Sequence, residues 1–172
     1  MTPEVSRGAS FSRDGRYRYS LTRRWSDGAR VVWVMLNPST ADARVDDPTL
    51  RRCLAISMRY GFGSLEVVNL FALRSSDPRA LGWVDDPVGP RADVALARAV
   101  RRADAAVAAW GVPPRGWEAR TTKVQAMLPR DVLALGLTAD GHPRHPLYVR
   151  RDAPLVRLDS LTVRSAQPTM AA

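Results

Sequence analysis

Four apolar segments that alternate with helical patterns constrain the fold of this chain most strongly. The first runs from Val31 to Leu36, and its β-branched and aromatic residues predict a strand buried on both faces. Three more apolar segments follow, at residues 65–73, 103–110 and 131–137. Apolar residues recur at helical spacing between them, over residues 48–60, 90–102 and 117–128. This order predicts an α/β fold, a three-layer α/β/α sandwich around a mainly parallel four-stranded sheet.

The N-terminal part adds one more expected element. Residues 17–25 alternate in polarity and precede the turn residues Ser26-Asp27-Gly28, which predicts an antiparallel hairpin leading into the first central strand. A length of 172 residues suits one domain. We therefore expect a flexible N-terminus over residues 1–15, a single α/β domain over residues 16–158 and a disordered tail over residues 159–172.

The chain is strongly basic. Its 26 Lys and Arg residues against 17 Asp and Glu give a formal net charge of +9. Such a balance favours polyanionic partners, so we expect a nucleic acid or a nucleotide as ligand. An arginine-rich composition can also reflect codon usage, and the charge then indicates no partner. The oligomeric state is open, with a monomer as the simplest expectation.

Missing residues and motifs exclude several kinds of site. Cys53 is the only cysteine, so an internal disulfide and a cysteine-based metal site are excluded. His142 and His145 are the only histidines, and we expect no metal. Neither GxGxxG nor GxxxxGK[ST] occurs, so no cofactor is expected. No apolar run approaches the roughly 18 to 20 residues of a membrane span, which favours a cytoplasmic protein without a membrane partner.

Polar residues stand where each predicted strand ends. Asn37 follows the first strand, and Asn69 lies inside or at the end of the second. Trp110 and Gly111 follow the third strand, and the loop at residues 141–148 follows the fourth. Because the carboxyl ends of parallel strands meet at one edge of a sheet, these segments should line a common crevice.

Both asparagines allow two interpretations. Asn37 precedes Pro38, a common start of a turn, but its amide also carries the donor and the acceptor needed to hold a water or read a base edge. Asn69 lies among apolar residues, where an unpaired buried amide costs about 1 to 3 kcal/mol. It is therefore either satisfied by the backbone or available to a ligand.

Charged residues follow the Asn37 loop. Asp46 or Asp47 is suited to cap the next helix, and the sharper alternative is that Asp42 or Asp47 acts as a general base. Arg51 and Arg52 belong to the first turn of that helix, where cations oppose the helix dipole. This unfavourable placement indicates an anionic partner.

The loop around His145 is the second strong feature. Pro143 and Pro146 restrict its backbone and so reduce the entropy lost on binding. His145 is either a plain surface histidine or a donor to a developing oxyanion near neutral pH. Leu147 and Tyr148 would stand beside it as an apolar wedge or a stacking face.

Short motifs resemble a bacterial and phage family known only as a domain of unknown function. They lie within residues 17–150 and read MLNPSTAD from Met35, DDPT from Asp46 with Arg51 to Cys53, NLFA from Asn69 with Arg74, DP at Asp77, AWG from Ala109 and HPLY from His145. The resemblance is specific but implies no activity.

The chain is also similar to the uracil-DNA glycosylase superfamily, an α/β/α sandwich with a four-stranded parallel sheet. The resemblance implies that Asn37, in an Asn-Pro motif, positions the attacking water, and that Asn69 reads the base edge. It further implies that His145 contacts the base oxygen and that Leu147 enters the duplex. An apolar strand ending in Trp-Gly, here at Trp110, belongs to the same pattern.

Three departures from that pattern stand in the sequence. Met35 replaces the usual Gly, and no obvious aromatic residue follows the first motif. The last motif reads HPRHPL rather than HPxPL, so His142 is an alternative match to His145.

These observations together predict a nucleobase-recognising protein of the uracil-DNA glycosylase-like type, which would hydrolyse an N-glycosidic bond in DNA or a nucleotide. The alternatives are a catalytically silent module that binds nucleic acid or a nucleotide, and a small-molecule hydrolase. The expected catalytic residues are Asn37, Asp42, Asp47 and His145. The expected substrate-binding residues are Pro38, Ser39, Asn69, Phe71, Trp110, Leu147 and Tyr148. The expected phosphate contacts are Arg51, Arg52, Arg74, Arg144 and Arg150.

Overall fold

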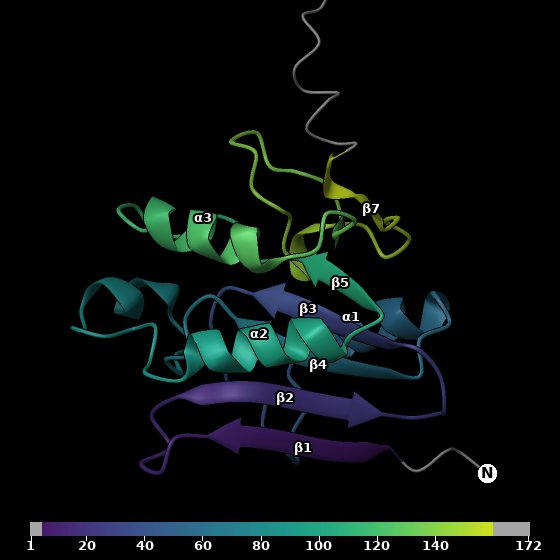
Figure 1. Cartoon of the computed structure of the whole chain (residues 1–172), viewed down its shortest axis with the longest axis horizontal. Coiled ribbons are helices and arrows are strands. Elements are labelled where there is room, and N and C mark those ends of the chain that lie inside the picture. Colours follow the sequence, from purple (N-terminus) through teal and green to yellow (C-terminus); the bar gives the residue numbers. More distant parts are fainter. Residues whose placement is uncertain (1–4, 160–172) are drawn as a thin grey trace, which may run out of the picture.

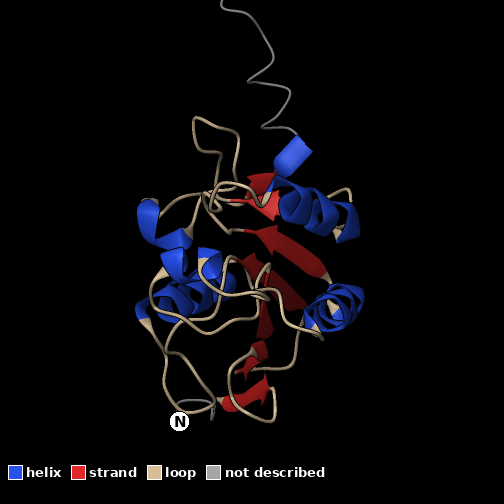
Figure 2. Ribbon diagram, turned by 90° about the vertical axis from the view of Figure 1, so that its left-hand side faces the viewer, coloured by secondary structure: helices blue, strands red, loops and turns tan. Residues whose placement is uncertain are grey.

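The computed structural model describes residues 5–159, which form one sheet with helices on both faces (Figures 1 and 2). Its strands lie in the order β1-β2-β4-β3-β5-β6-β7. The strands are β1 (Ser6–Phe11), β2 (Arg18–Arg24), β3 (Arg30–Met35), β4 (Ser64–Asn69), β5 (Ala105–Ala108), β6 (Leu133–Ala134) and β7 (Val156–Arg157). The helices are α1 (Pro48–Arg59), α2 (Ala92–Arg102) and α3 (Glu118–Met127), with 3-10 helices η1 (Pro78–Gly82) and η2 (Pro146–Tyr148).

The central strands β4, β3, β5 and β6 are parallel, which confirms the predicted α/β class. Every residue of β4 is buried, and so is β3 from Val31 to Met35. Strands covered on both faces need mostly apolar residues rather than strict alternation. β3 supplies an unbroken apolar run from Val31, whereas β4 includes the buried polar residues Glu66 and Asn69. Trp33 sits at the centre, level with Val67 of β4 and Val107 of β5.

Helices cover the two faces of the sheet unequally, as Figure 2 shows edge-on. On one face, Cys53 and Ile56 of α1 pack in a core with Trp33. On the other face, Leu96 of α2 and Val124 of α3 belong to a second core. The sandwich therefore has three layers, with the sheet in the middle.

The N-terminal strands depart from the predicted hairpin. β2 pairs antiparallel with β4 and with β1, and β4 separates it from β3. Residues 6–11, expected to be flexible, form β1. Because β4 is central and buried, its free edge would leave backbone donors unpaired, and β2 provides their partners. The turn after β2 lies close against Gly63, where an added Cβ would stand 2.8 Å from the Ser26 carbonyl oxygen.

Other expectations differ in length only. The apolar segment at residues 65–73 is a strand only as far as Asn69, and the strand in the segment at 131–137 is confined to Leu133–Ala134, with an isolated bridge from Leu137 to Pro143. The tail expected at residues 159–172 lies outside the described residues, apart from Asp159. Within residues 5–159, no helix has the length and apolarity to cross a membrane.

The path of the chain creates a crevice at the carboxyl end of the sheet. β3 leads into α1 on one face, and its neighbour β5 leads into α3 on the opposite face. Loops that leave adjacent strands toward opposite faces open a gap between them, which is where α/β sheets bind ligands. The segments after Met35 and Ala108 flank this gap.

Candidate functional site

A cavity of about 710 Å³ occupies this crevice. Its wall includes Asn37 after β3, Asn69 at the end of β4 and Trp110 after β5. His145 and Asp47 complete the polar lining from the C-terminal loop and the start of α1. The volume is typical of a site for a small molecule or cofactor. Four strand-end segments that are distant in sequence thus meet, as the topology predicts.

Asn37 is half-buried and partly committed to the fold. Its Nδ2 donates to the backbone oxygens of Ser75 at 2.8 Å and Pro38 at 3.1 Å. These bonds tie the loop after β3 to the loop after β4. Its Oδ1 accepts no hydrogen bond from residues 5–159, so this oxygen is available to a water or a ligand in the cavity.

Asn69 is not satisfied by the backbone. The residue is 5% exposed, and its Nδ2 is buried without a hydrogen-bond partner among the described residues. Since it lines the cavity, a ligand that enters there can supply the missing acceptor.

Trp110 presents a second buried donor to the cavity. Its Nε1 lacks a partner among the described residues. Gly111, the next residue, has a φ of +72°, a conformation that favours glycine, and its N–H donates to the Pro143 carbonyl at 2.8 Å. A Cβ on Gly111 would stand 3.4 Å from the Cβ of His145. The turn after β5 therefore holds the histidine loop against the cavity.

His145 is oriented as a donor. Its Nδ1 accepts the Leu147 N–H at 3.3 Å, so the neutral ring carries its proton on Nε2. Burial lowers the pKa of His145 below its ordinary 6.5, while the Asp47 carboxylate opposes the shift. The ring is consequently neutral at pH 7 and can donate from Nε2. His142, the alternative in the sequence, does not line the cavity.

Two exposed apolar residues stand beside His145. The Tyr148 ring lies 5.5 Å from the imidazole and is 79% exposed as a residue, while Leu147 is also exposed. Both line the cavity at this side. Side chains of this kind can cover a bound ring or stack on it.

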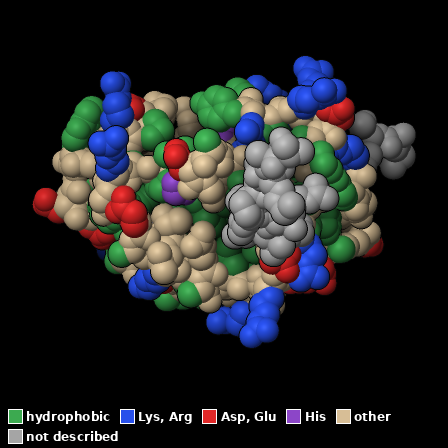
Figure 3. Space-filling model, turned by 90° about the horizontal axis from the view of Figure 1, so that it is seen from above, with side chains coloured by type: hydrophobic (Ala, Val, Ile, Leu, Met, Phe, Trp, Pro, Cys, Tyr) green, Lys and Arg blue, Asp and Glu red, His purple; other side chains and the backbone are tan. Residues whose placement is uncertain are grey.

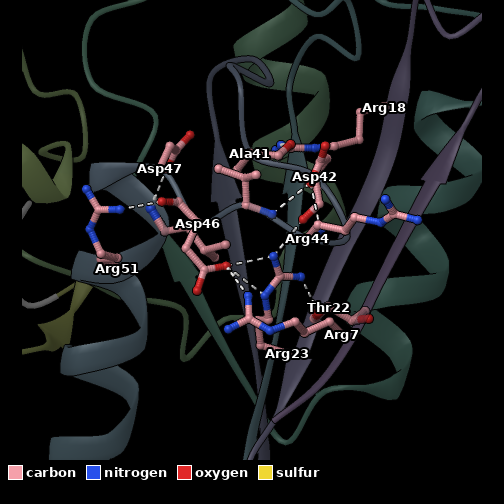
Figure 4. Close-up of polar contacts among 12 residues, drawn as sticks. Arg7, Arg18, Thr22, Arg23, Ala41, Asp42, Arg44, Asp46, Asp47 and Arg51 are labelled. Carbon is pink, nitrogen blue, oxygen red and sulfur yellow. Dashed lines mark hydrogen bonds and ion pairs between the residues drawn. The ribbon is translucent and has the colours of Figure 1, made fainter.

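The three aspartates after Asn37 have different roles, drawn in Figure 4. Asp47 caps α1, since its Oδ1 accepts the Leu50 N–H at 2.7 Å, and its Oδ2 accepts no hydrogen bond from residues 5–159. Asp46 forms an ion pair with Arg23 at 2.7 Å. Asp42 folds back on its own loop and does not line the cavity, so it is poorly placed as a general base.

Arg52 supports the histidine loop. It donates to the backbone oxygens of Pro146 at 3.3 Å, Val149 at 3.1 Å and Arg150. These bonds explain a cation near the start of α1 without an anionic partner. The residue positions His145 through the backbone of its loop.

The other arginines expected at phosphates also have partners within the chain. Arg51 donates to the Asp46 carbonyl, and Arg74 donates to the Gly15 carbonyl at 3.2 Å. Arg150 pairs with Asp152 at 3.1 Å. Only Arg144 of the five lines the cavity, and its Nε donates to the Leu137 carbonyl at 2.8 Å.

The remaining expected ligand contacts divide. Ser39 lines the cavity, whereas Pro38 and Phe71 do not. Phe71 is fully buried in the core beneath α2 and α3, where its ring meets that of Trp117 edge-on at 5.0 Å. It lies two residues beyond the end of β4, and the structure places it in this core rather than in the cavity wall.

Arg18 is a lining residue that the sequence pattern does not reveal. It lies at the start of β2 between Tyr17 and Tyr19, which both belong to the core beneath α2 and α3, so strict alternation would place it on the opposite face of the sheet. The pairing of β1 with β2 is irregular here, because the register shifts between Ser10, which pairs with Ser20, and Phe11, which pairs with Arg18. Arg18 is nevertheless 4% exposed and lines the cavity. Within residues 5–159, no group of three or more His, Cys, Asp or Glu side chains could hold a metal ion.

The comparisons with known proteins give a family but no activity. No curated protein and no solved structure matches the chain, so these comparisons do not support the resemblance to uracil-DNA glycosylases. One family model, described as protein of unknown function (DUF1643), matches residues 18–147 of the 172. That range contains the Asn37 loop and His145, and the chain belongs to the DUF1643 family.

Proposed function

We propose that the cavity binds a nucleobase and that the protein hydrolyses the N-glycosidic bond of a nucleotide or nucleic acid. One observation carries the proposal: among residues 5–159, four buried side-chain nitrogens lack a partner, and three of them line this cavity. They are Nε of Arg18, Nδ2 of Asn69 and Nε1 of Trp110. Unpaired buried donors cost about 1 to 3 kcal/mol each, so their convergence favours a ligand rich in acceptors.

A nucleobase fits this lining chemically. Its edge carries carbonyl oxygens and ring nitrogens as acceptors, and the Asn69 amide offers both a donor and an acceptor for reading such an edge. The flat ring of the exposed Tyr148 and the apolar side chain of Leu147 line the same cavity. These side chains can pack on the faces of a planar ligand.

The lining also suits hydrolysis. The water oxygen would bond to C1′ of the sugar while the C1′–N bond breaks and its electron pair passes to the base. Neutral His145, donating from Nε2, would stabilise the negative charge that develops on the base. Oδ1 of Asn37 would orient the water and Oδ2 of Asp47 would accept its proton. The departing base then takes up a proton from solvent.

The resemblance to uracil-DNA glycosylases supports the same assignment. In that superfamily an asparagine holds the water, a second reads the base and a histidine contacts its oxygen. Asn37, Asn69 and His145 follow in this order along the chain and line a common cavity.

The two histidines provide a matched test. The full chain is incubated with nucleosides, nucleotides, and single- and double-stranded oligonucleotides containing uracil, mispaired thymine or deaminated purines, and free base is measured by chromatography. We expect His145→Gln to lower base release about 100- to 1,000-fold, as for a lost oxyanion donor, and His142→Gln to retain it. Equal release by both variants, or none by the wild type on any substrate, would refute the hydrolase.

A binding module without chemistry is the second candidate. It is favoured because Nδ2 of Asn37 and Oδ1 of Asp47, on the two residues assigned to water, already bond to the chain. A module would bind nucleotides in calorimetry but release no base. If the bound form is a nucleic acid, its affinity should fall steeply with salt.

A further inference from the structure

Among the described residues, three arginines are buried: Arg18, Arg23 and Arg120. Two of them have a carboxylate partner. Arg23 pairs with Asp46 at 2.7 Å, and Arg120 pairs with Asp93 at 2.5 Å. Such pairing is the normal requirement for a buried cation, because removal from water is compensated only by an opposite charge and hydrogen bonds.

Arg18 lacks such a partner. Its Nη1 donates to the Ala41 carbonyl at 2.7 Å, its Nε is buried without an acceptor, and within residues 5–159 no carboxylate lies at ion-pair distance. Burial lowers its pKa to about 10, with the Asp47 carboxylate acting in the opposite direction. The guanidinium therefore stays charged at neutral pH, with donors left over. Figure 4 shows Arg18 with Ala41, apart from the Arg23–Asp46 pair.

The unused donors of Arg18 belong to the cavity wall. Arg18 lines the cavity together with Thr40 and Ser76, whose hydroxyls form no hydrogen bond with residues 5–159. Thr40 adjoins Ala41, the residue that Arg18 contacts. A buried cation with neighbouring hydroxyl donors is the lining that an oxyanion requires.

We propose that Arg18 binds a terminal anionic oxygen group of the ligand, a phosphate monoester or a carboxylate, and that the ligand is a small molecule. Arg18 is only 4% exposed, which favours a group at the end of a ligand over a phosphodiester inside a strand, because a strand continues on both sides of each phosphate. The anion site rests on Arg18 and the neighbouring hydroxyls and does not depend on the proposed function. The further statement that the ligand is a nucleotide rests on the proposed function.

The surface arginines agree with a small ligand. Of the five expected at phosphates, Arg51, Arg52 and Arg74 donate to backbone carbonyls, and Arg150 pairs with Asp152. In Figure 3, Lys and Arg side chains project at several separate places on the face shown rather than along one stripe. A strand-binding groove would need such a stripe.

The test compares Arg18→Met with Arg16→Met in the full chain. Both remove one positive charge, but Arg16 is exposed and lies outside the cavity lining. The probes are inorganic phosphate, acetate, and nucleosides paired with their 5′-monophosphates, measured by titration calorimetry and by thermal protection. We expect an anionic probe to bind the wild type and Arg16→Met, and Arg18→Met to bind it about 10- to 100-fold more weakly, as for the loss of hydrogen bonds to a charged group. Phosphate against acetate distinguishes the two anion sources.

Stability separates ligand binding from a structural role. An unpaired buried charge replaced by an apolar side chain of similar length should leave the unfolding temperature unchanged or raise it. If Arg18→Met does not fold, Arg18→Lys takes its place in the test. The ligand site is then retained only if Arg18→Lys folds and binds the anion more weakly than wild type does. Equal anion binding by Arg18→Met and wild type, or no anion bound by wild type, also overturns it.

The outcomes distinguish this site from the proposed hydrolysis. Arg18-dependent anion binding without base release from any substrate retains the site and removes the hydrolase. If base release is equal for nucleosides and monophosphates and is unaffected by Arg18→Met, the hydrolase is retained and the anion site is removed. Arg18-dependent binding of an oligonucleotide without terminal phosphates would overturn the small-molecule ligand.

Discussion

Replacing Asp46 with alanine should destabilise the protein by about 3 kcal/mol. Asp46 Oδ1 accepts from Nε and Nη2 of Arg23, at 3.0 and 2.7 Å, and the Arg23 side chain is fully buried. Removing one partner of a buried pair costs about 3 to 5 kcal/mol, because the remaining charge is uncompensated. The lower end applies here, since Arg23 keeps bonds to the carbonyls of Asp42 at 2.6 Å and Thr22 at 2.8 Å.

Urea unfolding followed by circular dichroism measures the change. For a chain of this size, the loss corresponds to a fall in unfolding temperature of about 6 to 12 °C. Asp27→Ala is the control: it removes the pair with Arg24, in which Asp27 is 96% exposed, and should change stability little. The double variant Arg23→Met/Asp46→Ala should recover most of the loss. A loss below about 1 kcal/mol, or a double variant less stable than Asp46→Ala, would refute the reasoning.

Two further changes test the site residues. Asp47→Ala should lower the free energy of unfolding by about 1 kcal/mol through loss of the helix cap, whereas Asp47→Asn should keep the cap and lose base release; equal stability of the two variants would contradict the capping role. Burial lowers the pKa of His145 below its ordinary 6.5, so as the pH falls the unfolded chain binds a proton at this imidazole before the folded chain does. The stability that the neutral, buried His145 contributes is therefore complete above pH 6.5 and is lost as the pH falls below that value. Denaturant unfolding at pH 5.5 and 7.5 should show a smaller pH difference for His145→Gln than for wild type, and an equal difference would contradict this pKa direction.

Much of the candidate site follows from local signals. The apolar run before Asn37 predicts where β3 ends, and the two carboxylates before Pro48 predict a helix cap, which the structure assigns to Asp47 rather than Asp46. Asn69 and Trp110 were expected at the strand ends and do line the cavity. Phe71 lies in the core and not in the cavity wall, because β4 ends at Asn69 and the direction of a later side chain depends on where strand pairing stops.

The phosphate contacts show why charge alone is a poor guide. Arg52 has the residue type and the sequence position expected of a phosphate contact. Its acceptors, however, are backbone oxygens 94 to 98 residues further along the chain. Nothing near Arg52 in the sequence indicates that these carbonyls lie within reach. The net charge of +9 therefore says less about a polyanionic partner than it first suggests.

The sequence by itself determined the alternation of strands and helices, the parallel centre and the edge where the site lies, because periodicity, capping and turn residues act over a few neighbours. Only the tertiary structure decided the pairing of β2 with β4, the burial of Arg18 and the partners of the surface arginines. These depend on which distant segments share an edge or a face, and a single chain's local pattern does not encode that choice. Arg18 illustrates the difference: nothing in its local pattern indicates a ligand contact, and only the assembled cavity leaves it buried with an Nε that has no acceptor among the described residues.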